Sequence, residues 1–138
     1  MRLLCFQAKR FSWRPFERTL PGAADANDAV EVHDAVVAFL HVERGDVEGE
    51  GGESAFRQAL KHVKWLANKR GLRTVVLHSF AHLGGDSAPP NLAQALLERL
   101  AARLADGGYA PHLTPFGWVN EWDLSVFGES LAKVWKQI

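Results

Sequence analysis

A continuous apolar run, Ala35–Val42 (AVVAFLHV), constrains the fold more than any other feature of the sequence. An apolar run of this length without alternation is typical of a central strand covered on both faces. A helix is predicted next, because apolar residues recur at helical spacing over 56–67, between a candidate N-cap at Ser54 and a stop at Gly71. The β-rich run Thr74–Phe80 follows. Strand, helix and strand in this order predict a βαβ unit with a parallel sheet and a right-handed crossover.

Two short strands are predicted before this unit. Leu3–Phe6 is typical of a buried strand, and residues 11–14 alternate apolar and polar side chains after a tight connection at Ala8–Lys9. Pro15 has no backbone donor, so the second strand is expected to lie at an edge of the sheet or to stop early. The polar segment 19–34 is expected to be a loop.

Three further features are predicted after the unit. A leucine-striped helix begins near Pro89–Pro90, where a missing backbone donor is tolerated, and ends at Asp106–Gly108. Tyr109–Pro115 and Glu121–Phe127 are expected to form an antiparallel hairpin around the turn PFGWVN. The apolar spacing over 131–138 predicts a short final helix.

These elements place the chain in the α/β class. The prediction is one domain over residues 1–138, with a mixed sheet, helices packed on it and the order ββ-β-α-β-α-ββ-α. A chain of 138 residues is long enough for one core. Sixteen Lys and Arg balance sixteen Asp and Glu, which argues against a strongly cationic nucleic-acid module and against a disordered polyelectrolyte.

The single cysteine, Cys5, excludes an internal disulfide and a cysteine-rich zinc site, and it fits a reducing compartment. No apolar run reaches the length of a membrane span, and the opening MRLLCFQAKR is too short and too soon charged for a signal peptide. The chain is therefore expected to be cytoplasmic, with no membrane partner.

Charge is segregated along the neutral chain. Residues 1–18 carry five bases and one acid, residues 25–53 carry nine acids and one base, and residues 57–73 carry six bases and no acid. Either these segments fold into a basic face, or they form a mixed solvated surface. Arg57, Lys61 and Lys64 form a stripe on the first predicted helix, for which a phosphate contact and plain solvent exposure both remain open.

No metal-protease, P-loop, dinucleotide or nucleophile-elbow motif is present, and neither a metal nor a cofactor is expected. His82 follows the strand 74–80, and ligands of open α/β sheets bind beyond the carboxyl ends of strands. Its imidazole can bind a substrate oxygen or position water, or it can hold its own loop. The loop Gly84–Ser87 offers backbone donors for an anion or an oxyanion. Phe116, Trp118 and Trp122 can stack on a nucleobase or pack in the core.

Several segments together resemble a known family. SFAHLGG at 79–85, the leucine-rich helix, PFGW at 115–118, the SLAKVW ending and AFLHVE at 38–43 are similar to the N-terminal editing domain of archaeal-type threonyl-tRNA synthetases. That domain shares its fold with D-aminoacyl-tRNA deacylases. The resemblance covers nearly the whole chain and implies hydrolysis of wrongly charged seryl-tRNA(Thr), a tRNA partner and a homodimer.

The resemblance also implies site residues. Phe80, Ala81 and His82 match the pocket segment after the strand, Val42 matches a position lining the aminoacyl-adenosine pocket, and the turn that borders it matches Phe116 and Gly117.

The chain departs from the family at three positions. A Tyr and a catalytic-type Lys of the family correspond to Val119 and Asn120, and a Glu of its last helix corresponds to Lys133. We take His82, Asn120 and Lys133 as the candidate catalytic residues, with backbone donors near residues 80–82 supporting the oxyanion.

Two functions from different classes follow. The first is a deacylase of mischarged aminoacyl-tRNA, acting alone or in trans with a separate threonyl-tRNA synthetase, since no synthetase core accompanies the sequence. The second is a module that keeps the pocket but has lost catalysis, and binds an aminoacyl-nucleotide or a synthetase. An unrelated hydrolase centred on a histidine is a third reading, but it lacks a nucleophile motif.

Overall fold

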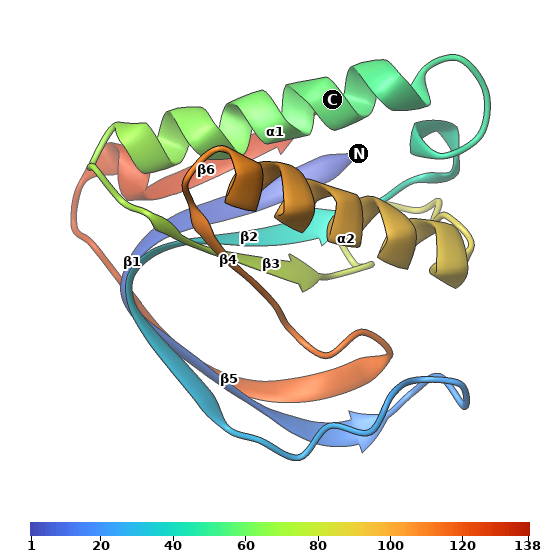
Figure 1. Ribbon diagram of the computed structural model, residues 1–138, viewed down its shortest axis with the longest axis horizontal. Coiled ribbons are helices and arrows are strands. Elements are labelled where there is room, and N and C mark those ends of the chain that lie inside the picture. Colours follow the sequence, from blue (N-terminus) through green and yellow to red (C-terminus); the bar gives the residue numbers. More distant parts are fainter.

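The computed structural model describes residues 1–138 as a strongly curved mixed sheet with two helices on one face (Figure 1). The strand order is β4-β3-β2-β1-β5, and β6 adds to β1 as well. The strands are β1 (Arg2–Arg18), β2 (Val30–His41), β3 (Thr74–Ser79), β4 (Ala110–Leu113), β5 (Trp118–Val126) and β6 (Lys133–Gln137). The helices are α1 (Gly52–Asn68) and α2 (Pro90–Asp106), with short 3-10 turns η1 (Arg44–Asp46) and η2 (Ser130–Ala132). None of the helices is long and apolar enough to cross a bilayer.

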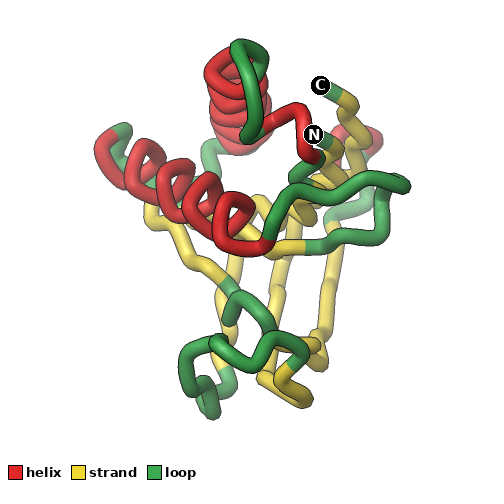
Figure 2. The backbone as a smooth tube through the Cα atoms, turned by 90° about the vertical axis from the view of Figure 1, so that its right-hand side faces the viewer, coloured by secondary structure: helices red, strands yellow, loops and turns green.

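The predicted parallel unit is confirmed, but its first strand begins at Val30, so the last five residues of the segment 19–34 are strand and not loop, because they continue the ladder with β1. β2 and β3 are parallel with α1 between them in the chain, and β3 and β4 repeat the arrangement with α2. Figure 2 shows α1 and α2 on the same side of the sheet. Gly71 follows α1 with φ 67°, and Gly108 follows α2 with φ 84°, so both predicted helix stops are left-handed glycines. The predicted N-cap at Ser54 is wrong, because α1 already begins at Gly52 and Ser54 lies inside its first turn.

The two predicted N-terminal strands are one strand, β1, of 17 residues. No turn separates them: the register against β5 shifts between Ala8 and Arg10, so Lys9 is a bulge inside the strand. The expectation for Pro15 holds in one part: at this residue β1 is paired with β5 alone, as at a sheet edge, but the strand does not stop and continues to Arg18. Proline is tolerated there because the ladder with β2 ends at Trp13 and the ladder with β5 is irregular directly after it.

The predicted C-terminal hairpin is wrong. β4 pairs with β3, whereas β5 pairs with β1, so the two strands lie on opposite edges of the sheet. The physical reason is that the crossover through α2 returns the chain at the open edge of β3, where β4 extends the parallel ladder. The segment between them, residues 114–117, therefore crosses from one edge of the sheet to the other.

The predicted final helix is wrong as well. Only Ser130–Ala132 form a helical turn, and Lys133–Gln137 form β6, antiparallel to the first residues of β1. So short a helix has an unfavourable nucleus, whereas the open edge of β1 satisfies the backbone groups of the same residues.

Both faces of the sheet are covered. The larger core lies under the helices and joins Leu40 of β2 to Val63 of α1 and Leu100 of α2. The smaller core lies on the other face, where Phe39 of β2 and Phe11 of β1 pack with ring centroids 6.3 Å apart. Cys5 lies in the larger core with no exposed surface, and burial raises the pKa of its thiol to about 12, so the thiol stays protonated and inert.

Both chain ends are tied to the fold (Figure 2). The buried ammonium group of Met1 lies 2.9 Å from Glu43 Oε2 and 2.8 Å from the Asp46 carboxylate, and the Met1 carbonyl accepts a hydrogen bond from the Ile138 amide. Burial by itself would raise the pKa of Glu43, but the hydrogen bond and charge of the ammonium, with the charges of Arg2 and His41, lower this pKa below 4.5.

Gly117 holds the crossing segment against the loop after β1. Its φ is 80°, and its carbonyl accepts hydrogen bonds from the amides of Thr19 (2.8 Å) and Leu20 (3.2 Å). A Cβ at this position would lie 2.8 Å from the Ala23 Cβ. Both the conformation and the space therefore require glycine.

We expect Glu43→Gln to lower the free energy of unfolding by about 1–3 kcal/mol, because it removes a charged acceptor from a buried ammonium. Because the pKa of Glu43 is lower in the folded chain, its stabilisation is present above pH 4.5 and is lost as the pH falls through the folded-state pKa. Urea unfolding of both proteins between pH 7 and pH 3 measures this. The control is Glu48→Gln, whose carboxylate is half exposed; equal losses in the two variants would contradict the assignment.

We expect Gly117→Ala to destabilise the fold by about 1–3 kcal/mol, since alanine is strained at this φ and meets Ala23. The matched control is Gly128→Ala, which has open space at its Cβ position. Thermal unfolding of the two variants is the measurement, and the prediction fails if they melt together.

Candidate functional site

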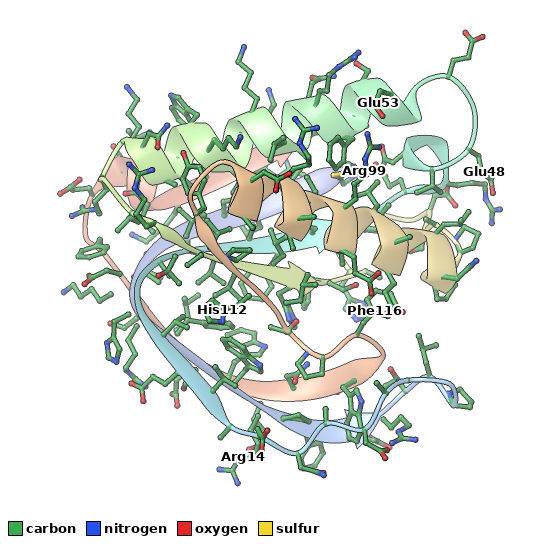
Figure 3. All side chains as sticks on the ribbon, in the orientation of Figure 1. Arg14, Glu48, Glu53, Arg99, His112 and Phe116 are labelled. Carbon is green, nitrogen blue, oxygen red and sulfur yellow. The ribbon has the colours of Figure 1, made fainter.

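One cavity of about 450 Å³ opens between the start of α2, the carboxyl ends of β2 and β3, and the crossing segment before β5. His82 from the loop after β3, and Phe116, Gly117 and Asn120 from the crossing segment and β5, line the same cavity. Figure 3 shows Phe116 on the crossing segment, between α2 and β5. Two stretches that lie more than thirty residues apart in the sequence thus meet at one hollow.

The cavity lies where the sequence predicted a ligand site. Leu40 and Val42 at the end of β2 and Ser79 at the end of β3 contribute to its wall. Parallel strands present their carboxyl ends at the same edge of a sheet, and the chain must leave them through loops there. No lysine, arginine, aspartate or glutamate lines this cavity, so its polar character comes from imidazole, hydroxyl, amide and backbone groups.

The loop after β3 is held at both ends and open in the middle. The Phe80 amide donates to the Leu40 carbonyl (2.9 Å), the Ala88 amide donates to the Val42 carbonyl (3.0 Å), and Arg2 Nη1 donates to the Leu83 carbonyl (2.9 Å). Of the backbone donors predicted near residues 80–82, the amide of Phe80 is therefore used by the fold. The amides of Ala81 and His82 make no hydrogen bond within the chain, so they are unpaired backbone donors in residues that line the cavity.

His82 is exposed on this loop, and its ring packs edge to face on Phe80 at 5.2 Å. Phe80 in turn contacts Phe39, with centroids 5.4 Å apart. The imidazole therefore rests on an aromatic support at the cavity wall, and its polar edge is not used in any hydrogen bond of the fold.

His78 lines the cavity from within the sheet, and the sequence did not single it out as a site residue. Desolvation lowers its pKa to about 4, so the imidazole is neutral at neutral pH, and its Nδ1 lies 2.8 Å from Thr114 Oγ1. The only sequence signal for His78 was the alternation of side chains along β3, which places residue 78 on the same face of the sheet as Phe80.

A second pair missed by the sequence is His41 and Ser87. Ser87 lines the cavity, and its Oγ lies 2.9 Å from Nε2 of the fully buried His41 at the end of β2. This contact joins residues 46 apart in the chain, so no local pattern could reveal it. It fixes the Ser87 hydroxyl on the wall beside Val42.

Asn120 is the polar residue of the opposite wall. Its Nδ2 donates to the Trp118 carbonyl (3.1 Å), while its buried Oδ1 has no partner. A buried acceptor without a donor is unfavourable, so Asn120 Oδ1 is an orphaned polar atom in a residue that lines the cavity. Val119 beside it is half exposed and adds apolar surface to the cavity.

The structure does not bring Lys133 to this cavity. Lys133 opens β6, pairs with Phe6 of β1 and is absent from the cavity wall. The reason is the change from helix to strand, which ties the C-terminal segment to the edge of β1. The other proposed residues, Val42, Phe80, Ala81, His82, Phe116, Gly117, Val119 and Asn120, all line the cavity.

The sequence left two roles open for the candidate aromatic side chains, stacking on a nucleobase and packing in the core. Phe116, Trp118 and Trp122 all line the cavity, but Trp118 Nε1 also donates to the Ala24 carbonyl (2.9 Å) and its ring faces Arg18. Trp122 packs on Phe39 with centroids 5.5 Å apart. No group of three or more His, Cys, Asp or Glu side chains is arranged to hold a metal ion.

Known proteins resemble the whole chain. The family described as the archaea-specific editing domain of threonyl-tRNA synthetase matches residues 1–138. The threonine–tRNA ligase of Cenarchaeum symbiosum is 31% identical over 100% of this chain and 21% of its own length, and that of Hyperthermus butylicus is 32% identical over 97% and 22%. The chain thus spans about a fifth of the length of these curated relatives.

A solved structure, the c-Myc DNA unwinding element binding protein, matches 100% of this chain and 99% of its own with a TM-score of 0.65 and 13% identity. This likeness concerns the fold alone, which is the D-aminoacyl-tRNA deacylase-like fold implied by the sequence. Because the family match extends from the first to the last residue, the chain belongs to the family of archaea-specific editing domains of threonyl-tRNA synthetase.

Proposed function

We propose that this chain is a proofreading deacylase that hydrolyses the ester of a mischarged aminoacyl-tRNA, with seryl-tRNA(Thr) as the substrate that its family implies. It acts on its own, in trans, or together with a separate threonyl-tRNA synthetase. The observation that carries the proposal is the pairing, on one cavity, of two free amides at Ala81 and His82 with the unpaired Oδ1 of Asn120. The family to which the chain belongs supports the same role.

The reaction makes modest demands on the protein, because an aminoacyl ester is already activated. Water adds to the carbonyl carbon, the tetrahedral intermediate carries a negative oxygen, and the ribose oxygen leaves with a proton as the amino acid is released. The amides of Ala81 and His82 would bind that negative oxygen. Since no acidic or basic side chain other than histidine lines the cavity, the backbone supplies much of the stabilisation.

His82 is the residue that we assign to proton transfer. Its ring is exposed on the cavity wall, next to the same free amides. An imidazole there can take a proton from the attacking water and return it to the leaving ribose oxygen. His78 is less suited to this role, because burial lowers its pKa to about 4 and Thr114 occupies its Nδ1.

Asn120 is the residue that we assign to the aminoacyl group. Its unpaired Oδ1 can accept a hydrogen bond from the α-ammonium group of the substrate, and a bond to a charged donor is among the stronger ones. Val42, Phe80 and Phe116 would form the apolar walls around the aminoacyl-adenosine end.

The proposal includes a homodimer, as the family resemblance implies. The molar mass of the protein in solution checks this part.

A non-catalytic binding module is the second candidate. The observation that favours it is the neutral Asn120 at a position where the family carries a lysine, together with the location of Lys133 outside the cavity. Such a module would bind an aminoacyl-nucleotide without hydrolysing it. Both the deacylase and the binding module would bind an aminoacyl-nucleotide, but only the deacylase would hydrolyse its ester.

We expect the purified chain, in excess over substrate, to release serine from seryl-tRNA(Thr), and His82→Ala to lower the single-turnover rate by about 10²–10⁴. The measurement is the loss of labelled amino acid from the tRNA, repeated with other mischarged tRNAs. His33→Ala is the matched control, because His33 is exposed and outside the cavity. If the native chain hydrolysed none of these esters, the deacylase proposal would be wrong; an unchanged rate in His82→Ala would remove the assignment of His82 alone.

We expect Asn120→Leu to weaken binding of a non-hydrolysable seryl-adenosine analogue by about 10- to 100-fold, because it removes an acceptor for a charged donor. Asn120→Asp keeps the acceptor and should bind at least as tightly. Calorimetry with the analogue, and with a second analogue that lacks the α-amino group, separates this contact from packing. The assignment fails if Asn120→Leu weakens both analogues equally, and tight binding by a chain without turnover would favour the binding module.

A further inference from the structure

α1 carries a basic groove on its outer side, away from the cavity already described. The groove is a depression of about 500 Å³, lined by Arg57, Leu60, Lys61, Lys64, Trp65 and Asn68. Figure 3 shows long nitrogen-tipped side chains projecting from this helix into solvent. Three of the six bases of the segment 57–73, namely Arg57, Lys61 and Lys64, therefore share one surface, whereas Arg70 pairs with Glu129 outside the groove.

The three cations of the basic groove have no counter-ion in the fold. Arg57, Lys61 and Lys64 take part in none of the ion pairs of the protein, whereas Arg70 beyond them pairs with Glu129. The nearest acid on α1, Glu53, is engaged by Arg99 through both carboxylate oxygens. Figure 3 shows Glu53 near the start of α1, one turn before Arg57, with its carboxylate engaged by Arg99 rather than by the groove cations.

Helix stability does not explain this arrangement. Like charges three and four residues apart, as in Arg57, Lys61 and Lys64, repel each other and destabilise a helix. Cations stabilise the helix dipole only in the last turn, and these three lie in the middle of α1. The fold accounts for Lys64, whose Nζ lies beside Gly107 at the end of α2 and 5.9 Å from the Tyr109 ring. It offers no partner to Arg57 or Lys61, and a bound polyanion would remove the repulsion among the three cations.

Aromatic rings flank the cations. Trp65 is 39% exposed in the groove, and its ring stacks on His62 at 5.6 Å. Next to the groove, Tyr109 Oη donates to Asn68 Oδ1 (2.6 Å), and the Lys64 Nζ lies 5.9 Å from the Tyr109 ring. Cations interleaved with an exposed aromatic ring are typical of surfaces that bind nucleic acid, because cations contact phosphates and the ring stacks on a base.

We propose that the basic groove of α1 binds the phosphate backbone of the tRNA whose aminoacylated end enters the cavity. This rests on the proposed function for the identity of the RNA. The overall neutral chain then uses a local surface, rather than net charge, to attract a polyanion. An acidic protein surface would match the cations as well. RNA is favoured because Trp65, although its ring stacks on His62 and lies under Lys69 Nζ, keeps 39% of its surface exposed among the cations, where a base could contact it.

The test is Lys61→Glu/Lys64→Glu, measured by filter binding of uncharged tRNA over a range of salt concentrations. We expect binding at least tenfold weaker at low salt, and a slope of log affinity against log salt that is smaller by about 1–2, as expected for two lost phosphate contacts. Hydrolysis of the small substrate seryl-adenosine should be unchanged, because the groove and the cavity share no residue. Trp65→Ala should weaken tRNA binding without changing the salt slope. Lys61→Ala/Lys64→Ala is the milder variant, and circular dichroism checks that each protein is folded.

The matched control is Arg10→Glu/Arg14→Glu, which changes net charge equally on exposed residues of β1. Figure 3 shows Arg14 at the far end of the molecule from α1. The proposal would be overturned if both double variants lost tRNA affinity equally, or if folded groove variants bound tRNA as the native chain does. If the groove variants lost binding to an acidic protein but not to tRNA, the groove would be assigned to a protein partner instead. Binding of uncharged tRNA does not depend on hydrolysis, so the two proposals can fail separately. If the native chain showed no deacylase activity but the groove variant still lost tRNA binding, the proposed function would be wrong and the groove assignment would stand.

Discussion

The ladder formed by β1 is the interaction on which the rest of the structure depends. β2 pairs with β1 over residues 2–13, β6 pairs with its first residues, and β5 pairs with its second half. The ladders skip Lys9 of β1 and Asp34 of β2, whose φ is 51°. Both strands curve strongly (Figure 1), so helices cover one half of the sheet while β5 lies opposite α2. Without this curvature the crossing segment before β5 would not face the loop after β3.

The cavity follows from that curvature and from the parallel strands. The carboxyl ends of β2 and β3 supply one wall, and the crossing segment supplies the other, so its polar groups come from segments far apart in the chain. The wall is apolar apart from a few uncharged or imidazole groups, which limits what the site can do by side-chain charge. The amides of Ala81 and His82, which make no hydrogen bond within the chain, and the orphaned Oδ1 of Asn120 are the unpaired polar groups on which the proposed function rests.

Much of the architecture, and most of the residues that line the cavity, could be predicted from the sequence. The βαβ unit, the start of α2 at Pro90 and the glycine stops were predicted because each depends on residues near one another in the chain. His82 and Phe116 were predicted from their position after a strand and in a turn. One error was at Lys9, where a bulge looks like a turn. The others were in the C-terminal hairpin, whose strands pair with β3 and β1 instead of with each other, and after Ala132, where five residues with helical spacing pair with β1 as a strand.

The sequence by itself determined the class of fold, the parallel core and the segments that carry the site, since apolar periodicity and turn residues are local properties. Only the tertiary structure decided which edge receives β4, β5 and β6, because the choice depends on which backbone edges are still open once the sheet forms. For the same reason the tertiary structure alone excluded Lys133 from the cavity and joined His41 to Ser87. These contacts depend on the curvature of β1 and on distances through space, which cannot be calculated from the spacing of residues along the chain.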